Sequence, residues 1–309
     1  MDMEELAEQI IRLKEEQDAI LLVHNYQRPE IQDVADFLGD SLGLAMKASK
    51  VDKKNIIFCG VDFMAESAKI LNPDKRVVHP IVPPHLIAKC PMAAMADRET
   101  VLAYKAKHPG AVVVSYVNTT AEVKAVSDYC CTSSNAVKVV SNIPEKKVIF
   151  VPDEHLGNYV KRSIKDKEII LWPGYCRTHV RITKQEVLEL KDEHPEAVII
   201  VHPECTYDVI DIADEVFSTE GMTKYAASSD ATEFIVGTER ELGHRLRKEN
   251  PGKKFYFGQR AVCPNMKQIR IENVLNSMRT LRPTVELDPE IMKLARIPLE
   301  RMLEMGRGD

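Results

Sequence analysis

The chain has 309 residues, 44% of them hydrophobic, and a formal net charge of −5. Lys and Glu are interspersed, with no basic stripe of the kind that neutralises a phosphate backbone, so we expect no nucleic-acid partner. Apolar runs such as 197–201 are far too short to cross a bilayer, and the N-terminus lacks a basic region followed by an apolar one, which predicts a cytoplasmic protein with no membrane partner.

The first stretch of the chain predicts a helix followed by alternating strands and helices. Leu6, Ile10 and Leu13 fall on one face of an amphipathic helix over 3–18. Strands are then expected at 20–24, near Phe37 and at 55–59. Helices are expected at 31–35, from Ser41 onward and at 62–71.

The same order of elements recurs twice more. The second copy predicts strands at 111–115, 128–131 and 147–151, with helices at 121–126, 133–140 and 154–163. The third copy extends from Ala197 to about Phe257. Length alone suggests about two domains, but the repeat favours three units, at 1–83, 84–172 and 173–287. The Pro-rich segment 80–84 is the expected linker between the first two units, and a helix over 288–305 is expected to pack back on the first unit.

Strands that alternate with helices of this length predict parallel sheets joined by right-handed crossovers. The strands are apolar on both faces, as buried parallel strands must be. We therefore expect an α/β fold of three homologous three-layer αβα domains, arranged about a pseudo-threefold axis.

Polar residues follow the first strand of each copy, where ligands bind in open α/β sheets. The three segments are Val23-His24-Asn25-Tyr26, Ser115-Tyr116-Val117-Asn118 and Val201-His202-Pro203-Glu204. Seventeen residues after His24, Tyr116 and His202 stand Ser41, Ser133 and Thr219, where a helix is expected to begin. Such a hydroxyl can cap the helix or bind a carboxylate. Three equivalent helix ends that converge on one axis would suit a small dicarboxylate.

Each copy ends on a cysteine in a loop-like context. Cys90, Cys176 and Cys263 are 86 and 87 residues apart, and Pro follows two of them directly. Three thiolates brought to one axis suit an iron–sulfur cluster with one open position. Cys59, Cys130 and Cys131 fall on predicted strands, and Cys205 is the main competing ligand. The three cysteines on predicted strands are expected to be core thiols.

These pieces together resemble the quinolinate synthase family over essentially the whole chain. The matching segments are His24-Asn25-Tyr26, Gly39-Asp40-Ser41, Ser115-Tyr116-Val117-Asn118, Thr132-Ser133-Ser134-Asn135-Ala136, Trp172-Pro173-Gly174-Tyr175-Cys176 with His179, His202-Pro203-Glu204-Cys205, Ser218-Thr219 and Cys263-Pro264-Asn265-Met266-Lys267.

The resemblance implies a [4Fe-4S] cluster held by Cys90, Cys176 and Cys263, with one iron open to substrate. It also implies a reaction of de novo NAD biosynthesis, in which iminosuccinate condenses with dihydroxyacetone phosphate to give quinolinate, phosphate and water. Functional coupling to the enzyme that makes iminosuccinate is implied as well.

The same resemblance implies the roles of individual residues. On chemical grounds, the acid and base candidates near the expected site are Tyr26, Tyr116, His202 and Glu204. The implied substrate-binding residues are His24, Ser41, Tyr116, Val117, Asn118, Ser133, His179, His202, Pro203, Glu204 and Thr219. The residue that binds the phosphate stays open among Lys89, Arg177, Arg260 and Lys267.

Other functions remain open at this point. A cluster-dependent hydro-lyase acting on another small polycarboxylate would use the same open iron. A non-catalytic triplicated protein could hold structural zinc, which requires a fourth ligand from Cys205 or His179. A redox switch would pair two of the cysteines. The sequence has no Gly-rich phosphate loop, so no bound nucleotide is expected.

Overall fold

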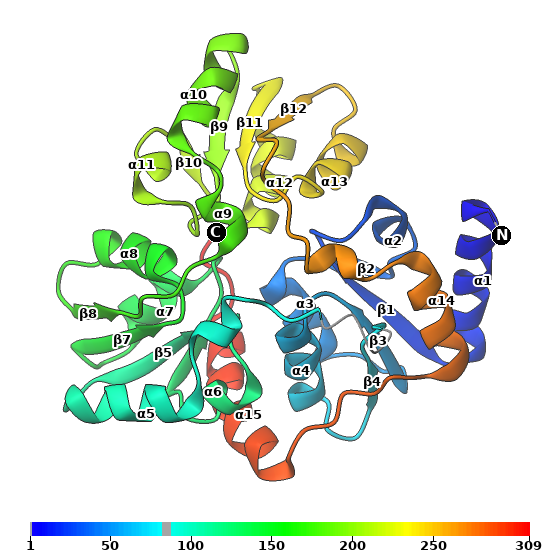
Figure 1. The fold of residues 1–309 in the computed structure, drawn as a ribbon, viewed down its shortest axis with the longest axis horizontal. Helices are drawn as coiled ribbons and strands as arrows, with labels where there is room; N and C mark the ends of the chain where they lie inside the picture. Colours follow the sequence, from blue (N-terminus) through cyan, green and yellow to red (C-terminus); the bar gives the residue numbers. More distant parts are fainter. Residues whose placement is uncertain (1, 82–87) are drawn as a thin grey trace.

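Three four-stranded parallel sheets meet around a common centre (Figure 1). The computed structural model describes residues 2–81 and 88–309. Each sheet carries helices on its faces, so the predicted α/β architecture of three similar three-layer units is confirmed. The expected linker 80–84 lies partly outside the described residues, and the expected boundary at 83/84 lies wholly outside them.

The first unit has the strand order β2-β1-β3-β4. Its strands are β1 (Ala19–His24), β2 (Phe37–Gly39), β3 (Asn55–Cys59) and β4 (Arg76–Val78). Its helices are α1 (Met3–Glu16), α2 (Pro29–Asp33), α3 (Ser41–Ala48) and α4 (Asp62–Leu71). Asp2 caps α1 by accepting the N–H of Glu5, which fixes the start of the predicted amphipathic helix.

The second unit repeats this topology as β6-β5-β7-β8. Its strands are β5 (Val112–Tyr116), β6 (Tyr129–Cys131), β7 (Lys147–Val151) and β8 (Glu168–Leu171). Its helices are α5 (Arg98–Lys107), α6 (Ala121–Lys124), α7 (Ala136–Asn142) and α8 (Glu154–Ser163). The short helix η1 (Ala93–Met95) precedes this unit.

The third unit has the order β10-β9-β11-β12. Its strands are β9 (Val198–Val201), β10 (Glu215–Val216), β11 (Glu233–Gly237) and β12 (Lys254–Phe257). Its helices are α9 (Arg177–Val180), α10 (Lys184–Glu193), α11 (Tyr207–Ile210), α12 (Thr219–Ser228) and α13 (Leu242–Glu249). The fourth strands β4 and β8 are additions to the predicted pattern.

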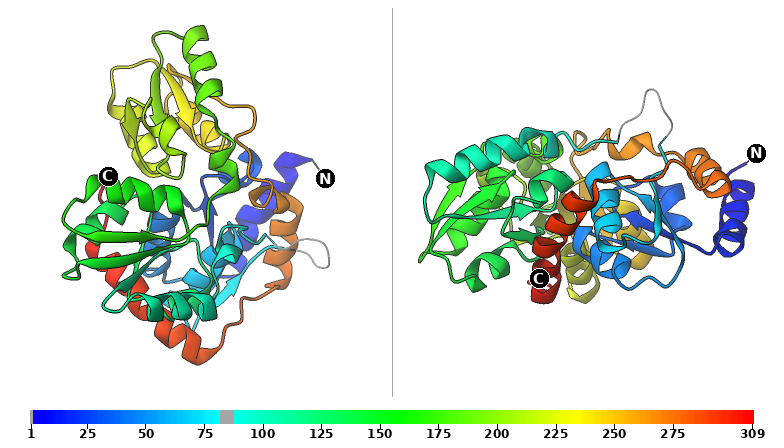
Figure 2. Two further views of the ribbon diagram at one scale, coloured as in Figure 1. Left: turned by 60° about the vertical axis from the view of Figure 1, so that its left-hand side comes forward. Right: turned by 90° about the horizontal axis from the view of Figure 1, so that it is seen from below.

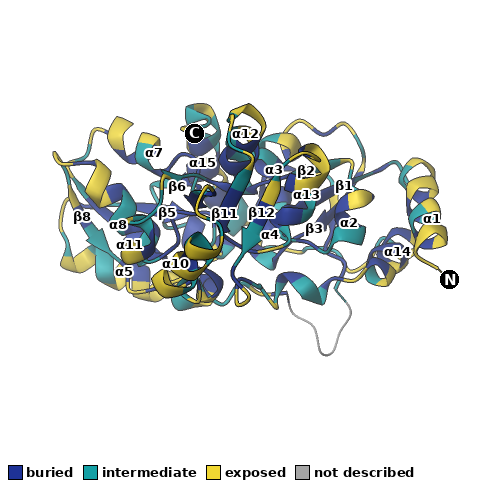
Figure 3. Cartoon of the chain, turned by 90° about the horizontal axis from the view of Figure 1, so that it is seen from above, coloured by how far each residue is buried: buried dark blue, intermediate teal, exposed yellow. Residues whose placement is uncertain are grey.

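Burial is deepest along the central strands of each sheet (Figure 3). In the first unit, β3 is buried at every residue, because helices cover both faces of the sheet. Met64, Leu156 and Leu242, which hold equivalent places in α4, α8 and α13, are all buried. The register predicted from the repeat is therefore the register of the packed core.

Two helices that follow the third unit in the chain pack against the first and second units. Helix η2 (Met266–Gln268) leads to α14 (Ile271–Thr280), which packs against α1 and β3. Helix α15 (Pro289–Met305) packs against α6 and β6 of the second unit and against α4 of the first, so it lies between these units (Figure 2). Among the described residues, no helix combines the length and apolar character that crossing a bilayer requires.

Candidate functional site

One cavity at the centre of the molecule, called here the central cavity, is lined by equivalent positions from all three units. Each unit contributes the residue at the end of its first strand, the residue two further on, the aligned hydroxyl and the cysteine. These are His24, Tyr26, Ser41 and Cys90, then Tyr116, Asn118, Ser133 and Cys176, then His202, Glu204, Thr219 and Cys263. The three sets of equivalent positions therefore meet at one cavity.

Two equivalent histidines at the strand ends have the same local geometry. His24 ends β1, and its Nδ1 accepts the backbone N–H of Tyr26 at 3.1 Å. His202 follows β9, and its Nδ1 accepts the N–H of Glu204 at 3.3 Å. Because Nδ1 is the acceptor, a neutral ring carries its proton on Nε2. Burial lowers the pKa of His24 to about 4 and that of His202 to about 3, so both rings are neutral donors near pH 7.

Two of the three aligned hydroxyls do not cap the helices that they begin. Asp40 is the N-cap of α3 and accepts the N–H of Gly43, while Ser218 is the N-cap of α12 and accepts the N–H of Gly221. Ser41 and Thr219 are the first helical residues, so capping is excluded as their role. In the second unit, α7 begins at Ala136, three residues after Ser133.

The hydroxyls of Ser41 and Ser133 have no hydrogen-bond partner within residues 2–81 and 88–309, although both line the central cavity. Thr219 Oγ1 accepts a hydrogen bond from Asn25 Nδ2 at 2.9 Å. A hydroxyl beside free N–H groups at a helix N-terminus is well suited to an anion. The cavity therefore presents hydroxyls that can bind an anion from more than one unit.

Acidic side chains hold two of the three cysteine loops. Asp62 Oδ1 accepts the N–H of Cys90 at 3.1 Å, and Glu239 Oε1 accepts the N–H of Cys263 at 3.1 Å. Glu239 is also paired with Lys267 at 3.0 Å, and it is fully buried. Both acids follow the third strand of their unit, so the sheet itself positions the loops.

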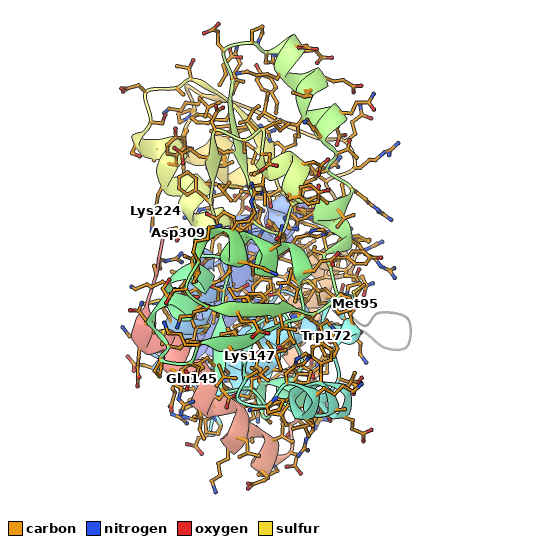
Figure 4. All side chains as sticks on the ribbon, turned by 90° about the vertical axis from the view of Figure 1, so that its left-hand side faces the viewer. Met95, Glu145, Lys147, Trp172, Lys224 and Asp309 are labelled. Atoms are coloured by element: carbon orange, nitrogen blue, oxygen red, sulfur yellow. The ribbon has the colours of Figure 1, made fainter. Side chains whose placement is uncertain are left out.

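Close backbone packing holds the third loop. A side chain at Gly174 would place its Cβ 2.2 Å from the carbonyl oxygen of Pro152, so only glycine permits this approach. The Trp172 indole donates to Met95 O at 2.8 Å, which ties the segment before Cys176 to the segment after Cys90 (Figure 4). The loops of these two cysteines are thus fixed to each other.

The three cysteine thiols are close enough to affect one another electrostatically. Burial raises the pKa of Cys90, Cys176 and Cys263, and neighbouring thiols raise it further for Cys90 and Cys176. A bound cation reverses this effect, because it binds the deprotonated thiolate. Three converging soft ligands in a largely buried setting fit an iron–sulfur cluster.

A continuous hydrogen-bonded network connects the two tyrosines of the site. Tyr116 OH donates to Glu204 Oε1, and Glu204 Oε2 lies 2.8 Å from His179 Nδ1. His179 Nε2 lies 2.9 Å from Thr238 Oγ1, which lies 2.6 Å from Tyr26 OH. His179 Nδ1 also lies 3.1 Å from Cys176 Sγ. The network therefore reaches from the second unit to the first and touches one cysteine.

Burial and neighbouring charges set the protonation of this network. Burial alone would raise the pKa of Glu204, but His179, His202 and Tyr116 lower it below its usual value. Glu204 is thus a buried carboxylate. Burial and then the charge of Glu204 raise the pKa of Tyr26 and Tyr116, so both phenols keep their protons near neutral pH.

Some residues singled out from the sequence lie elsewhere. Val117 is buried beside α4 and α15, and Pro203 borders a separate groove that it shares with Ser133; neither is part of the described lining of the central cavity. His179 is in the lining. Cys205 is fully buried, and its thiol donates to the carbonyl of Gly237. All seven cysteines are free thiols.

The sequence patterns gave no indication of four site residues: Thr238, Asp40, and the two acids that hold cysteine loops, Asp62 and Glu239. Thr238 is equivalent by position to Gly60 and Pro152, so the repeat carried no signal for it. Asp40 lies directly before the aligned hydroxyl Ser41, and the equivalent residues Thr132 and Ser218 are not acidic, so the repeat gave no signal for its carboxylate. Asp153 and Glu239 hold equivalent places after the third strand of their units, but Asp62 lies one residue further along than the equivalent place in the first unit, so the ungapped alignment shows this acid in only two of the three copies.

The chain is similar over nearly its whole length to known proteins of one family. The model of the family described as "Quinolinate synthetase A protein" matches residues 8–304. A protein of Methanoregula boonei named "Quinolinate synthase" is 50% identical over 301 residues, covering 97% of this chain and 98% of that protein. Proteins of the same name from Pelobacter propionicus and a Sulfurihydrogenibium species are also 50% identical, over 303 and 312 residues, and cover 98% and 99% of this chain and 98% and 100% of their own lengths. The chain therefore belongs to the quinolinate synthetase A family of enzymes.

Proposed function

We propose that this chain is a quinolinate synthase that condenses iminosuccinate with dihydroxyacetone phosphate to form quinolinate, phosphate and two waters. The observation that carries the proposal is the convergence of twelve equivalent positions, among them three cysteines, on the central cavity. An enzyme that oxidises aspartate would supply iminosuccinate. Membership of the family supports the same reaction.

The cofactor that we propose is a [4Fe-4S] cluster held by Cys90, Cys176 and Cys263. When bound, such a cluster supplies an open iron that acts as a Lewis acid toward substrate oxygen or nitrogen. The carboxylates of Asp62 and Glu239 position the loops of Cys90 and Cys263, and close packing at Gly174 positions the loop of Cys176. A structural zinc site is less well supported, because both candidates for its fourth ligand already have partners: the Cys205 thiol donates to a backbone carbonyl, and the two ring nitrogens of His179 lie within hydrogen-bond distance of Glu204 and Thr238.

We assign dicarboxylate binding to the hydroxyls and histidines of the central cavity. Ser41, Ser133 and Thr219 offer hydroxyl groups, and the N-termini of α3 and α12 add free N–H groups and the positive ends of helix dipoles. His24 and His202 offer Nε2–H donors that stay neutral near pH 7. Asn118 contributes an amide from the second unit.

We assign proton transfer to the buried network. With neutral His179 protonated on Nδ1, the ring donates to Glu204, and Thr238 donates to Nε2 while accepting from Tyr26. Once a proton is delivered to His179 Nε2, this nitrogen donates to Thr238 Oγ1, and Thr238 donates in turn to the phenol oxygen of Tyr26. The network can therefore move a proton between Tyr26 and His179 without moving any heavy atom. Tyr116 and Glu204 form the other end, where a proton can be given or taken.

Two arginines are the best placed groups for the phosphate. Arg177 and Arg181 line the central cavity, are exposed, and have no ion-pair partner in the described part of the chain. Lys267 already forms an ion pair with Glu239 and donates a hydrogen bond to the carbonyl of Tyr26. Arginine suits phosphate because its fork of N–H donors matches two phosphate oxygens.

The test is quinolinate formation from iminosuccinate and dihydroxyacetone phosphate by anaerobically reconstituted protein, compared with the cluster-free protein. Product that requires the cluster would support both the reaction and the metal. No product from fully loaded protein would favour a hydro-lyase acting on another small polycarboxylate.

A further inference from the structure

The segment Gly306–Asp309 follows α15 and contacts all three units where their hydroxyl-bearing segments begin. In the first unit, Arg307 bonds to Asp40. In the second, Gly308 N–H donates to Ser134 O at 2.9 Å. In the third, Asp309 Oδ2 accepts the N–H of Ser218 at 3.2 Å. The segment therefore lies at the centre of the molecule, where the three units meet (Figure 1).

Further contacts fix this segment in place. Asn135 Nδ2 donates to Gly306 O at 2.9 Å, and Lys138 Nζ donates to Arg307 O at 2.8 Å. Lys224 Nζ lies 3.4 Å from the backbone oxygen of Asp309, and the two residues are neighbours in Figure 4. These bonds come from the second and third units, so the segment is held from both sides.

Small residues make room for the segment. A Cβ at Gly308 would lie 2.8 Å from Ser134 O, and a Cβ at Gly221 would lie 2.8 Å from Asp309 Oδ2. A Cβ at Gly43 would lie 3.1 Å from the Arg307 guanidinium. Gly43 and Gly221 occupy equivalent places in α3 and α12, so the repeat leaves space at both helix ends for the same segment.

Arg307 forms a two-pronged ion pair with Asp40. Its two terminal nitrogens lie 2.9 Å from Oδ2 and 2.6 Å from Oδ1 of that carboxylate. The Asp40 side chain is 6% exposed, and Asp40 lines the central cavity. Ser218 of the third unit donates to the same carboxylate at 3.4 Å. An acidic group thus stands in the wall of the cavity in which a doubly negative substrate would bind.

A buried carboxylate repels a substrate carboxylate unless a cation compensates it. We propose that Arg307 is a positioning residue of the dicarboxylate site, which neutralises Asp40 and holds the N-terminus of α3 in register with Ser218. The inference rests on the proposed function, since it takes a dicarboxylate as the ligand. Asp40 caps α3, and Arg307 makes that cap compatible with an anionic ligand.

The experiment measures phthalate binding by calorimetry to cluster-loaded protein, together with kcat and KM for iminosuccinate. Phthalate is a non-reacting dicarboxylate of the same geometry as quinolinate. Arg307→Gln is expected to raise the phthalate Kd and the KM about tenfold, with a smaller change in kcat. Arg307→Lys keeps the charge but loses the fork and is expected to lie between the wild type and Arg307→Gln.

A second substitution separates neutralisation from folding. Asn caps helices as well as Asp does, so Asp40→Asn removes the charge and keeps the bond to Gly43 N–H. The double variant Asp40→Asn/Arg307→Gln is expected to bind phthalate within about threefold of the wild type. The matched control is Arg301→Gln on α15, because Arg301 contacts Asp128 O and the Tyr129 ring, away from the cavity.

The outcomes distinguish this inference from the proposed function. Unchanged phthalate binding by Arg307→Gln, or equally weak binding by the double variant, would overturn the role of Arg307. A wild type that binds phthalate but makes no quinolinate would overturn the proposed function alone. A wild type that does neither would overturn both. If Arg307→Gln fails to fold, the Lys variant and the double variant still decide.

Discussion

Glu204 Oε2 lies 2.8 Å from His179 Nδ1, and both side chains are almost completely buried. This pair joins a carboxylate from the loop after β9 to an imidazole from α9. It is the middle of the network that ends in Tyr26 and Tyr116. The pair fixes the orientation of the His179 ring and makes Glu204 a hydrogen-bond acceptor. Disrupting it therefore also affects the bonds to Tyr116 and Thr238 in the same network.

Glu204→Gln is expected to retain the cluster and to lower kcat about 100-fold or more. The amide is nearly the same size as the carboxylate but is neutral, so it cannot take a proton. Iron content and single-turnover quinolinate formation measure the two effects separately. The control is Glu196→Gln, at an exposed position. An unchanged rate would remove Glu204 from the mechanism.

Thr238→Val is expected to lower kcat by about tenfold to 100-fold while leaving iron content intact. Valine has nearly the same shape as threonine, but it cannot bridge Tyr26 OH and His179 Nε2. Thr238→Ser keeps the hydroxyl and is expected to retain most of the rate. Steady-state kinetics on the three proteins check the bridge, and equal rates for the Val and Ser variants would contradict it.

Cys90→Ala, Cys176→Ala and Cys263→Ala are each expected to abolish cluster assembly. Cys59→Ala and Cys205→Ala are the matched controls, because both thiols are fully buried and neither is part of the described cavity lining. Iron and sulfide per chain after anaerobic reconstitution give the readout, with the absorbance of the cluster as a second measure. Equal iron in all five variants would rule out the three-cysteine assignment.

The parts of the fold and site that repeat were predictable from the sequence. Parallel strands are buried on both faces, so β1, β5 and β9 appear as apolar runs, and the residues that end them are found by simple alignment. His24, Tyr116 and His202 were located in this way. Because the three sheets share one topology, equivalent positions in the sequence became equivalent positions around one cavity.

Other parts of the fold and site were not predictable, because they leave no distinctive local pattern in the sequence. Strand β4 has three residues and begins with an exposed Arg76, so it gave no apolar run. The spacing of Ser41 and Thr219 could not tell a cap from the first helical residue, because Asp40 and Ser218 cap equally well. Arg307 is 267 residues away from Asp40 in the sequence, and no local sequence pattern predicts such a contact.

The final prediction concerns His79, a buried histidine outside the central cavity. Its Nε2 lies 2.9 Å from Gly60 O, and burial lowers its pKa below the usual value of 6.5, although the Gly60 bond and Asp62 oppose this. The unfolded chain therefore binds more protons than the folded chain below about pH 6.5, and the stability that neutral His79 provides is lost as pH falls. His79→Gln can still donate to Gly60 O but cannot titrate, so its thermal midpoint should fall less between pH 7.5 and 5.5 than that of the wild type. The measurement is calorimetry on cluster-free protein, with the partly exposed His108→Gln as control. Parallel pH curves for wild type and His79→Gln would show that His79 does not contribute to the acid sensitivity of the fold.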